Sequence, residues 1–321
     1  LALRYPLDAA TKLIYLGTDL ILPLTLGYYC RYRGWLSETI CNQIIRLNIV
    51  VFCTLLAVLS FWSLPLNLEL LWLPLFGILL SFIPGLAGYV TARGNYAKGR
   101  DKASYLASAL LSNIGTLGGL CAFFVFGEPG FAYIQIIATF QNLVFFLFCF
   151  PMAQYYNSLL HEKTPGAAIL TFSALFLNRN QLPVAGIIAG MVLYAGNVAR
   201  PPVMGDLFNI LIHVSAWTAL FPVGYSIQFT EMKRYYHRIP ILMGIKFIFT
   251  PLVGYLIATQ LFTDPVVIGT ILIAASSPAG INAVVLARLY NFNVHLAGAA
   301  FVLTTALFLT VVYPILFFSL N

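Results

Sequence analysis

The sequence predicts an all-α polytopic membrane protein whose ten transmembrane helices form two inverted repeats of five. Composition, the spacing of apolar stretches and a likeness between the two halves support this fold class. The chain has 321 residues, of which 60% are hydrophobic and 8% are charged, and its mean hydropathy is +0.90. Because soluble globular chains carry about 25% charged residues, this composition excludes a soluble enzyme and a disordered protein.

Ten apolar stretches are long enough to span a membrane. A helix needs about 20 apolar residues to cross a hydrocarbon core of about 30 Å. Turn signals and charges separate neighbouring stretches. We therefore expect a first five-helix repeat over 1–153, a cytoplasmic connector over 154–181 and a second five-helix repeat over 182–321. The ten stretches lie near residues 9–30, 40–62, 68–91, 103–126, 130–153, 182–198, 204–228, 239–262, 265–289 and 294–319.

Lys and Arg residues concentrate in alternate connections between the predicted helices. The odd-numbered connections hold basic groups such as those at 93–102 and 233–238, whereas the even-numbered ones hold only Arg200. Basic residues mark cytoplasmic loops, so we expect both termini outside and a multi-pass protein of the cell membrane. The net charge of +7 is then a topology signal, and the expected partner is the lipid bilayer and not nucleic acid. The chain begins with Leu1 and not Met, and whether a leader or a short tail precedes Leu1 stays open.

The two halves of the chain share a pattern. Residues 112–151 and 277–314 each begin with a cluster of Ser, Gly, Asn or Pro inside an apolar stretch. Each then makes a short polar turn, continues as a long apolar helix and stops at a Pro. Because five helices are an odd number, the second copy must lie upside down in the membrane. Inverted repeats of this kind are typical of secondary transporters, whose sites lie near the midplane where broken helices meet.

Helices 4 and 9 are predicted to be broken near their centres, where small and polar residues crowd positions 112–119 and 276–282. Pro removes a backbone donor, and Gly in a helix costs about 1 kcal/mol relative to Ala. Such residues also let helices pack closely, but two clusters at equivalent places in inverted copies favour a crossing of broken helices at the midplane. We assign the crossover and its hinges to Ser112, Gly118, Gly119, Ser277 and Gly280.

Six motifs carry a family resemblance, and together they extend over most of the chain. In this order and spacing they are similar to the auxin efflux carrier family, whose fold is shared with the bile acid:sodium symporters (the BART superfamily). The motifs are LILPLTLGYYCRYRGWLSE (20–38), SNIGTLGGLCAFFVFGEPG (112–130), LPVAGIIAGMVLYAG (182–196), ALFPVGYSI (219–227), IKFIFTPLVGYLIA (245–258) and SSPAGINAVVLARLYN (276–291).

The resemblance implies a secondary carrier for a small organic anion, such as a carboxylate, that works by alternating access. It implies a scaffold of helices 1, 2, 6 and 7 and a transport domain of helices 3–5 and 8–10. It also implies that Asn113 and the backbone near Gly115 face the substrate carboxylate, and that Pro278 and Asn282 complete the crossing. A homodimer through the scaffold is expected by analogy. Family members often carry a Pro shortly after the first glycine cluster, where the corresponding stretch of this chain is Gly118-Gly119-Leu120.

Ionisable residues inside predicted helices are costly and are functional candidates. Asp19 lies midway along helix 1, where it carries a coupling proton or belongs to a structural ion pair; both interpretations stay open. Lys246 lies about two turns inside helix 8. It snorkels to the cytoplasmic surface, contacts an anion, or pairs with Asp19.

Other polar residues in the apolar stretches have a structural and a functional interpretation. His213 and His295 are lone histidines, for which a hydrogen-bonded core role is favoured over a proton relay. Gln141, Asn142, Thr304 and Thr305 follow the two predicted breaks, where they line the site or bond across helices. The full set of substrate-binding candidates is Asn113, Gly115, Thr116, Asn142, Pro278 and Asn282.

No sequence motif indicates catalysis, a resident metal or an organic cofactor. The chain lacks HExxH, GxSxG and a Walker glycine loop, so we expect no enzyme and no nucleotide-driven pump. Coupling to H⁺ or Na⁺ is left open. Two alternative functions also stay open, namely a sodium-coupled symporter of the bile-acid type and a membrane sensor or channel that reuses the carrier fold.

Overall fold

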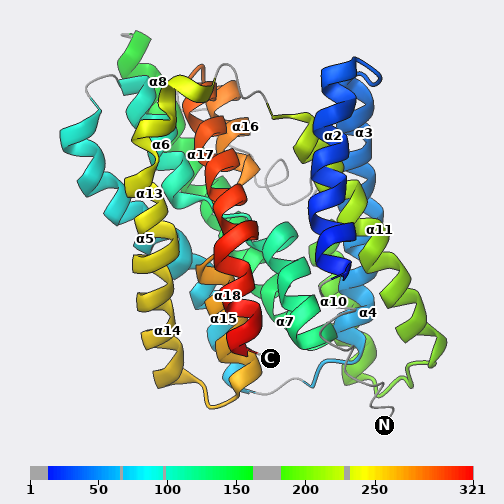
Figure 1. The fold of residues 1–321 in the computed structure, drawn as a ribbon. Helices are drawn as coiled ribbons and strands as arrows, with labels where there is room; N and C mark the ends of the chain where they lie inside the picture. Colours follow the sequence, from blue (N-terminus) through cyan, green and yellow to red (C-terminus); the bar gives the residue numbers. More distant parts are fainter. Residues whose placement is uncertain (1–13, 66–67, 97–98, 162–181, 228–231, 321) are drawn as a thin grey trace. The chain divides into compact units, whose positions relative to one another are not determined.

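The computed structural model describes residues 14–65, 68–96, 99–161, 182–227 and 232–320. These residues are nearly all helical and contain no β-strand, only one isolated antiparallel bridge between Ser112 and Ala279 (Figure 1). The predicted all-helical class is therefore correct.

Six helical stretches within the described ranges are long and apolar enough to cross a membrane. The helices predicted near 103–126 and 265–289 are each interrupted, and the one predicted at 182–198 is 14 residues long. The count of ten spans and the inverted repeat stay predictions. The six stretches are Glu38–Trp62, Glu69–Arg93, Ile114–Ala153, Val203–Tyr225, Pro240–Leu261 and Val294–Leu320.

The chain divides into two compact units, each made of two separate segments. The first unit comprises Leu1–Leu64 and Arg179–Ile227, and the second comprises Pro65–Asn178 and Gln228–Asn321. The helices of the first unit are the π-helical turn η1 (Leu16–Ile21), α2 (Leu22–Arg33), α3 (Glu38–Leu47), the π-helical turn η2 (Asn48–Cys53), α4 (Thr54–Trp62), α10 (Leu182–Ala195) and α11 (Val203–Tyr225).

Close backbone contact between α2 and α11 organises the first unit (Figure 1). A Cβ atom added to Gly27 would lie 2.0 Å from the carbonyl oxygen of Phe221, and one added to Gly224 would lie 2.0 Å from that of Leu24. Only glycine fits at either position, because the neighbouring atom is backbone on both sides. Small residues at helix interfaces allow such approach in membranes, so this pair fixes the packing of α2 on α11.

The second unit contains the two interrupted helices. Its remaining short elements are the 3₁₀ turns η3 (Leu68–Trp72) and η7 (Lys233–Arg238) and the π-helical turns η4 (Ile114–Gly118), η5 (Phe145–Cys149), η8 (Ile245–Phe249) and η9 (Phe308–Val312). Its α-helices are α5 (Leu73–Asn95), α6 (Gly99–Leu110), α7 (Gly119–Val144), α8 (Phe150–His161), α13 (Pro240–Gly244), α14 (Thr250–Leu261), α15 (Pro265–Ala275), α16 (Ile281–Leu289), α17 (Val294–Leu307) and α18 (Tyr313–Leu320).

Four of the π-helical turns are followed by a proline two residues after they end. The prolines are Pro23, Pro151, Pro251 and Pro314, after η1, η5, η8 and η9. A proline in a helix lacks the N–H group and clashes with the carbonyl four residues earlier. Widening the preceding turn by one residue relieves that clash and lets the helix continue. The apolar helices therefore bend or widen at these prolines but do not end there.

One predicted boundary differs from the structure, and another falls outside the residues that the structure describes. The connector was expected to begin at residue 154, but α8 continues to His161, and 162–181 lie outside the described residues. Helix 1 was expected from residue 9, and 9–13 also lie outside them. The long stretch Ile114–Ala153 is kinked at Gly127, where φ is 68° and ψ is −152°. This kink lies at the predicted boundary between helices 4 and 5.

Candidate functional site

The breaks of the two interrupted helices pair with each other through their backbones. α6 ends before residue 111 and η4 begins after 113, while α15 ends before 276 and α16 begins after 280. The N–H group of Asn113 donates to the carbonyl of Pro278 at 2.8 Å, and the N–H group of Gly280 donates to the carbonyl of Leu111 at 2.9 Å. We call residues 111–113 and 276–280 together the crossing. The second break thus lies inside its predicted cluster, and the first begins one residue before its own.

Small side chains keep the two sides of the crossing close together. A Cβ atom added to Gly118 would lie 2.7 Å from the hydroxyl oxygen of Ser277, and one added to Gly280 would lie 3.0 Å from the carbonyl oxygen of Ser112. The hydroxyl of Ser277 donates to the carbonyl of Ile273 at 3.1 Å. The structure therefore brings together four of the five residues assigned to the crossover, with the fifth, Gly119, one position further along.

The helix that follows each break supplies a polar side chain to the unwound backbone. Gln135 on α7 donates from its side-chain nitrogen to the carbonyl of Gly115 at 2.9 Å. Thr304 on α17 accepts from the N–H group of Ala279 at 3.0 Å through its hydroxyl. Backbone groups freed from a helix need such partners when they are buried. Sequence analysis flagged Thr304 but missed Gln135, which is one of three side-chain amides in the otherwise largely apolar α7.

Ser112 receives contacts from α7 and from η8. The amide of Gln141, in the orientation that satisfies both of its ends, donates to the Ser112 carbonyl at 2.9 Å and accepts from the Ser112 N–H group at 3.1 Å. The ammonium of Lys246 donates to the Ser112 hydroxyl at 2.7 Å and lies 3.4 Å from the carbonyl oxygen of Leu111. A lysine from η8 is therefore part of the crossing environment.

The side chain of Lys246 is fully buried, with 0% of its surface exposed. The snorkelling interpretation is wrong, because the ammonium bonds to the crossing and not to solvent. Lys246 makes no ion pair with any residue in the described ranges. A buried charge without a counter-ion is costly, so this group has the chemistry to attract an anion.

The predicted substrate ligands differ in their exposure. Asn113 is 8% exposed, and its side-chain amide has no hydrogen-bond partner among the described residues. Thr116 and Asn282 are exposed, and Asn142 is half-buried. Neither η4 nor α16 has a side-chain cap at its N-terminus. Two helix starts without a side-chain cap therefore adjoin the crossing, and helix starts favour anions.

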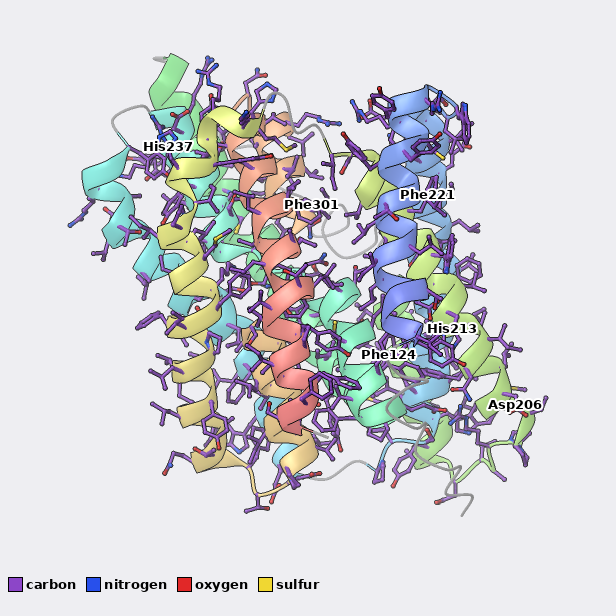
Figure 2. The ribbon with its side chains drawn as sticks, viewed as in Figure 1. Phe124, Asp206, His213, Phe221, His237 and Phe301 are labelled. Carbon is purple, nitrogen blue, oxygen red and sulfur yellow. The ribbon has the colours of Figure 1, made fainter. Side chains whose placement is uncertain are left out.

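Asp19 belongs to the first unit, where it has a partner of its own. Asp19 is 4% exposed, and its carboxylate contacts Nδ1 of His213 on α11; His213 is labelled in Figure 2. The hydroxyl of Thr18 lies 3.3 Å from Asp19 Oδ1, and the ring of Tyr15 packs on the His213 ring at 4.5 Å between centroids. Asp19 thus forms a carboxylate–imidazole pair with His213. The sequence position of either residue alone does not predict this pairing.

A charged cluster that sequence analysis missed joins three segments of the second unit. Asp101, in the first turn of α6, accepts from Arg238 at 2.9 Å and from the side-chain nitrogen of Asn293 at 2.8 Å. The Arg238 guanidinium lies 5.5 Å from the ring centre of Tyr96, and burial raises the pKa of Tyr96. The cluster ties the start of α6 to η7 and to the start of α17.

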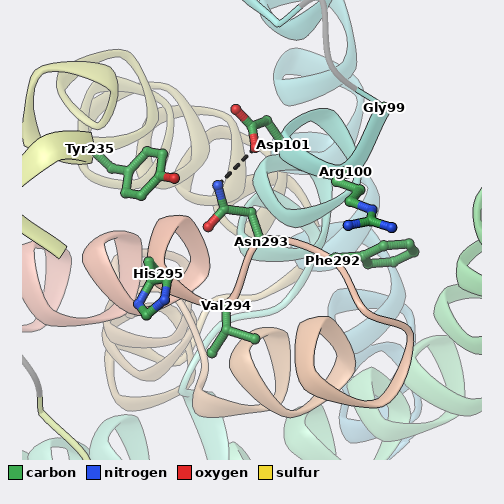
Figure 3. A pocket seen from close by; sticks show the side chains of 8 residues that line it. All are labelled: Gly99, Arg100, Asp101, Tyr235, Phe292, Asn293, Val294 and His295. Carbon is green, nitrogen blue, oxygen red and sulfur yellow. Dashed lines mark hydrogen bonds between the residues drawn. The ribbon is translucent and has the colours of Figure 1, made fainter. Parts of the chain in front are cut away.

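A pocket of about 630 Å³ adjoins this cluster (Figure 3). None of its lining residues belongs to the crossing, so it is distinct from the predicted site. Within the described ranges no three His, Cys, Asp or Glu side chains are grouped as metal ligands. The lining residues are Gly99, Arg100, Asp101, Tyr235, Phe292, Asn293, Val294 and His295.

Apolar helices of membrane-spanning length and buried polar groups at paired helix breaks are features of membrane transport proteins. A family model described as membrane transport protein matches residues 18–316. The chain belongs to this family, the auxin efflux carriers. It is therefore an integral, multi-pass membrane transporter, and its family is not a family of enzymes. No curated protein matches the chain.

Proposed function

We propose that the protein is a secondary carrier that moves a small organic anion, with a carboxylate as its charged group, by alternating access. The observation that carries this proposal is Lys246, which is fully buried, donates from its side-chain nitrogen to Ser112 in the crossing and has no ion-pair partner in the described ranges. An anionic substrate would balance the charge of the protonated side chain. A carboxylate also matches the geometry of amide and ammonium donors.

Further donors at the crossing support the same substrate class. The free side-chain amide of Asn113 is available to a carboxylate oxygen. The uncapped starts of η4 and α16 present N–H groups, and their positive ends favour negative charge. Gly115, Thr116, Asn142, Pro278 and Asn282 complete the proposed substrate-binding set.

The division of the chain into two compact units supports a moving-domain mechanism. Of the ten helices predicted from the sequence, we assign helices 1, 2, 6 and 7 to a scaffold. Predicted helices 3–5 and 8–10, which include the crossing, form a transport domain. The proposal includes ten helices in two inverted repeats, both termini outside, a location in the cell membrane and a homodimer through the scaffold. An anion that leaves a cell with a negative interior gains about 2.3 kcal/mol per charge per 100 mV, so uncoupled export would need no coupling ion, whereas uptake would need a proton or sodium.

The test is the thermal stability of the detergent-purified protein with lactate, malate, citrate or phenylacetate, each in sodium and in potassium. A ligand that binds the folded state raises stability by RT ln(1 + [L]/Kd), about 2.7 kcal/mol at 100 times Kd. We expect one of these carboxylates to raise the midpoint of thermal unfolding without sodium, and we expect this rise to be absent in Lys246→Met. The matched control is Lys233→Met, since Lys233 is an exposed lysine of the same unit.

Other outcomes identify the alternatives. A shift with sodium alone, or a carboxylate shift that requires sodium, would indicate a symporter of the bile-acid type. Binding without flux in proteoliposomes would indicate a sensor, and conductance far above carrier turnover would indicate a channel. An equal carboxylate shift in Lys246→Met and the wild type would remove Lys246 from the site.

A further inference from the structure

Lys246 is placed where its state of protonation decides whether the crossing holds a charge. Its nitrogen lies 2.7 Å from the Ser112 hydroxyl and 3.4 Å from the Leu111 carbonyl. Neither partner carries a formal charge, and the side chain has no contact with solvent. A lysine side chain can be a neutral amine or a charged ammonium, whereas an arginine side chain remains charged in proteins.

No titratable side chain on the elements around Lys246 is placed to balance its charge. α5, α13 and α14 pack on η8, and the ring of Phe308 in η9, an element without a titratable residue, lies 6.5 Å from the ring of Phe247 between centroids. α13 has no titratable residue, α14 has the exposed Tyr255, and α5 has the exposed Tyr89 and Arg93. Tyr89 and Arg93 bond to each other at 3.0 Å. The break that contacts Lys246, residues 111–113, has no titratable side chain either.

We propose that Lys246 takes up one proton together with the anionic substrate, so that the carrier is a proton–anion symporter. This inference rests on the proposed function, because it requires an anion at the crossing. An anion attracts the ammonium and not the neutral amine. Since coupling between two ligands is reciprocal, the proton strengthens anion binding as much as the anion strengthens proton binding.

The charge balance of the cycle follows from this coupling. On the loading side, the Lys246 amine takes a proton from water while a monocarboxylate enters, and the ammonium–carboxylate pair adds no net charge. On the other side the carboxylate leaves and the proton returns to water. The empty carrier then returns with a neutral amine, whose N–H group still donates to Ser112. One proton and one monoanion cross in each cycle, so transport is electroneutral.

Asp19, the other ionisable group at depth, is a weaker candidate for this role. It lies in the first unit, and its carboxylate contacts His213. Lys246, by contrast, bonds directly to the crossing. The structure therefore assigns proton coupling to the lysine, where proton and substrate share one set of contacts.

The experiment uses the full chain in proteoliposomes with the monocarboxylate, lactate or phenylacetate, that gives the larger thermal shift. A gradient of one pH unit corresponds to a tenfold equilibrium ratio, so we expect wild-type protein to accumulate a monocarboxylate up to about tenfold on the alkaline side. Lys246→Arg keeps the charge but cannot release a proton. We expect it to retain carboxylate-for-carboxylate exchange and to lose accumulation driven by the pH gradient. Lys233→Arg, the same substitution at an exposed lysine, should behave as the wild type.

Two results would overturn the inference. One is pH-driven accumulation in Lys246→Arg at the wild-type level. The other needs no variant and applies even when Lys246→Arg does not fold: wild-type carboxylate flux without proton co-movement, as reported by a pH dye inside the vesicles. In that case the proposed anion carrier would be retained, and only the proposed coupling to protons would be refuted. If no carboxylate shifts or crosses with the wild type, the proposed function itself fails.

Discussion

The contact between α2 and α11 allows one substitution to be worked out from distances. In Gly224→Ala, the new Cβ atom would lie 2.0 Å from the carbonyl oxygen of Leu24 and 2.7 Å from its Cα atom. Ordinary van der Waals contact begins at 3.4 Å, so the approach is short by 3.4 − 2.0, or about 1.4 Å. The obstructing atoms are backbone, and no side-chain rotation relieves them. The two helices must separate, which opens gaps along their interface.

Overpacking of a close interface costs about 1–3 kcal/mol or more. In a chain of this size about 1 kcal/mol lowers the midpoint of thermal unfolding by about 2 °C, so we expect Gly224→Ala to lower it by about 2–6 °C. The assay is thermal unfolding of the purified protein in detergent. Gly27→Ala, whose Cβ atom would lie 2.0 Å from the Phe221 carbonyl oxygen, should have a similar effect.

The matched control is on the same helix. A Cβ atom added to Gly205 of α11 meets nothing within 4 Å, and alanine is the better helix former by about 1 kcal/mol. Gly205→Ala should therefore leave the midpoint unchanged or raise it slightly. A midpoint for Gly224→Ala within about 1 °C of the wild type would show that α2 and α11 do not approach as closely as described, and would refute the reasoning.

Three further substitutions follow from buried or partly buried polar contacts, each read out by thermal unfolding. Asp19→Ala leaves His213 without its carboxylate and should cost about 3–5 kcal/mol if the pair is structural, with part of the loss recovered by adding His213→Leu; an unchanged midpoint would count against a structural role. Arg238→Met removes one partner of Asp101 and should cost about 1 kcal/mol, a loss that should shrink in 1 M salt, whereas a salt-independent loss would mean that packing is responsible. Thr304→Val keeps the shape but leaves a buried backbone N–H group unpaired, at about 1–3 kcal/mol, and Thr304→Ser should restore stability; equal stability of the Val and Ser variants would contradict this contact.

Much of the helical pattern could be predicted from composition and spacing. Apolar stretches separated by Gly, Pro and charged residues identify helices, because backbone groups in a bilayer must be satisfied within a segment. The clusters around Ser112 and Ser277 also located both helix breaks, since several helix-disfavouring residues within two turns have a summed effect. Boundaries were less accurate. α8 continues eight residues beyond 153, because Gln154–His161 contains no helix-breaking residue.

The polar contacts were harder to predict, because they depend on which helix faces overlap. The sequence shows that Lys246 lies inside an apolar helix, where a charge is costly. The length and charge of its side chain, however, fit snorkelling to the surface as well as they fit a buried hydrogen bond. Only the packing of η8 against the 111–113 break distinguishes the two. The pairing of Asp19 with His213 connects positions 194 residues apart, and that of Asp101 with Asn293 connects positions 192 apart. No local pattern records either contact.

The wide turn before Pro251 has a geometric consequence for the crossing. In η8 the N–H group of Thr250 bonds to the carbonyl of Ile245, five residues earlier. This turn therefore contains one more residue than an ordinary α-helical turn. Each residue of an α-helix advances about 100° around the axis. Without the extra residue, Lys246 would point about 100° away from its present azimuth, and its nitrogen could not reach Ser112. Pro251, five positions after Lys246, thereby sets the direction around the helix axis in which the Lys246 side chain points.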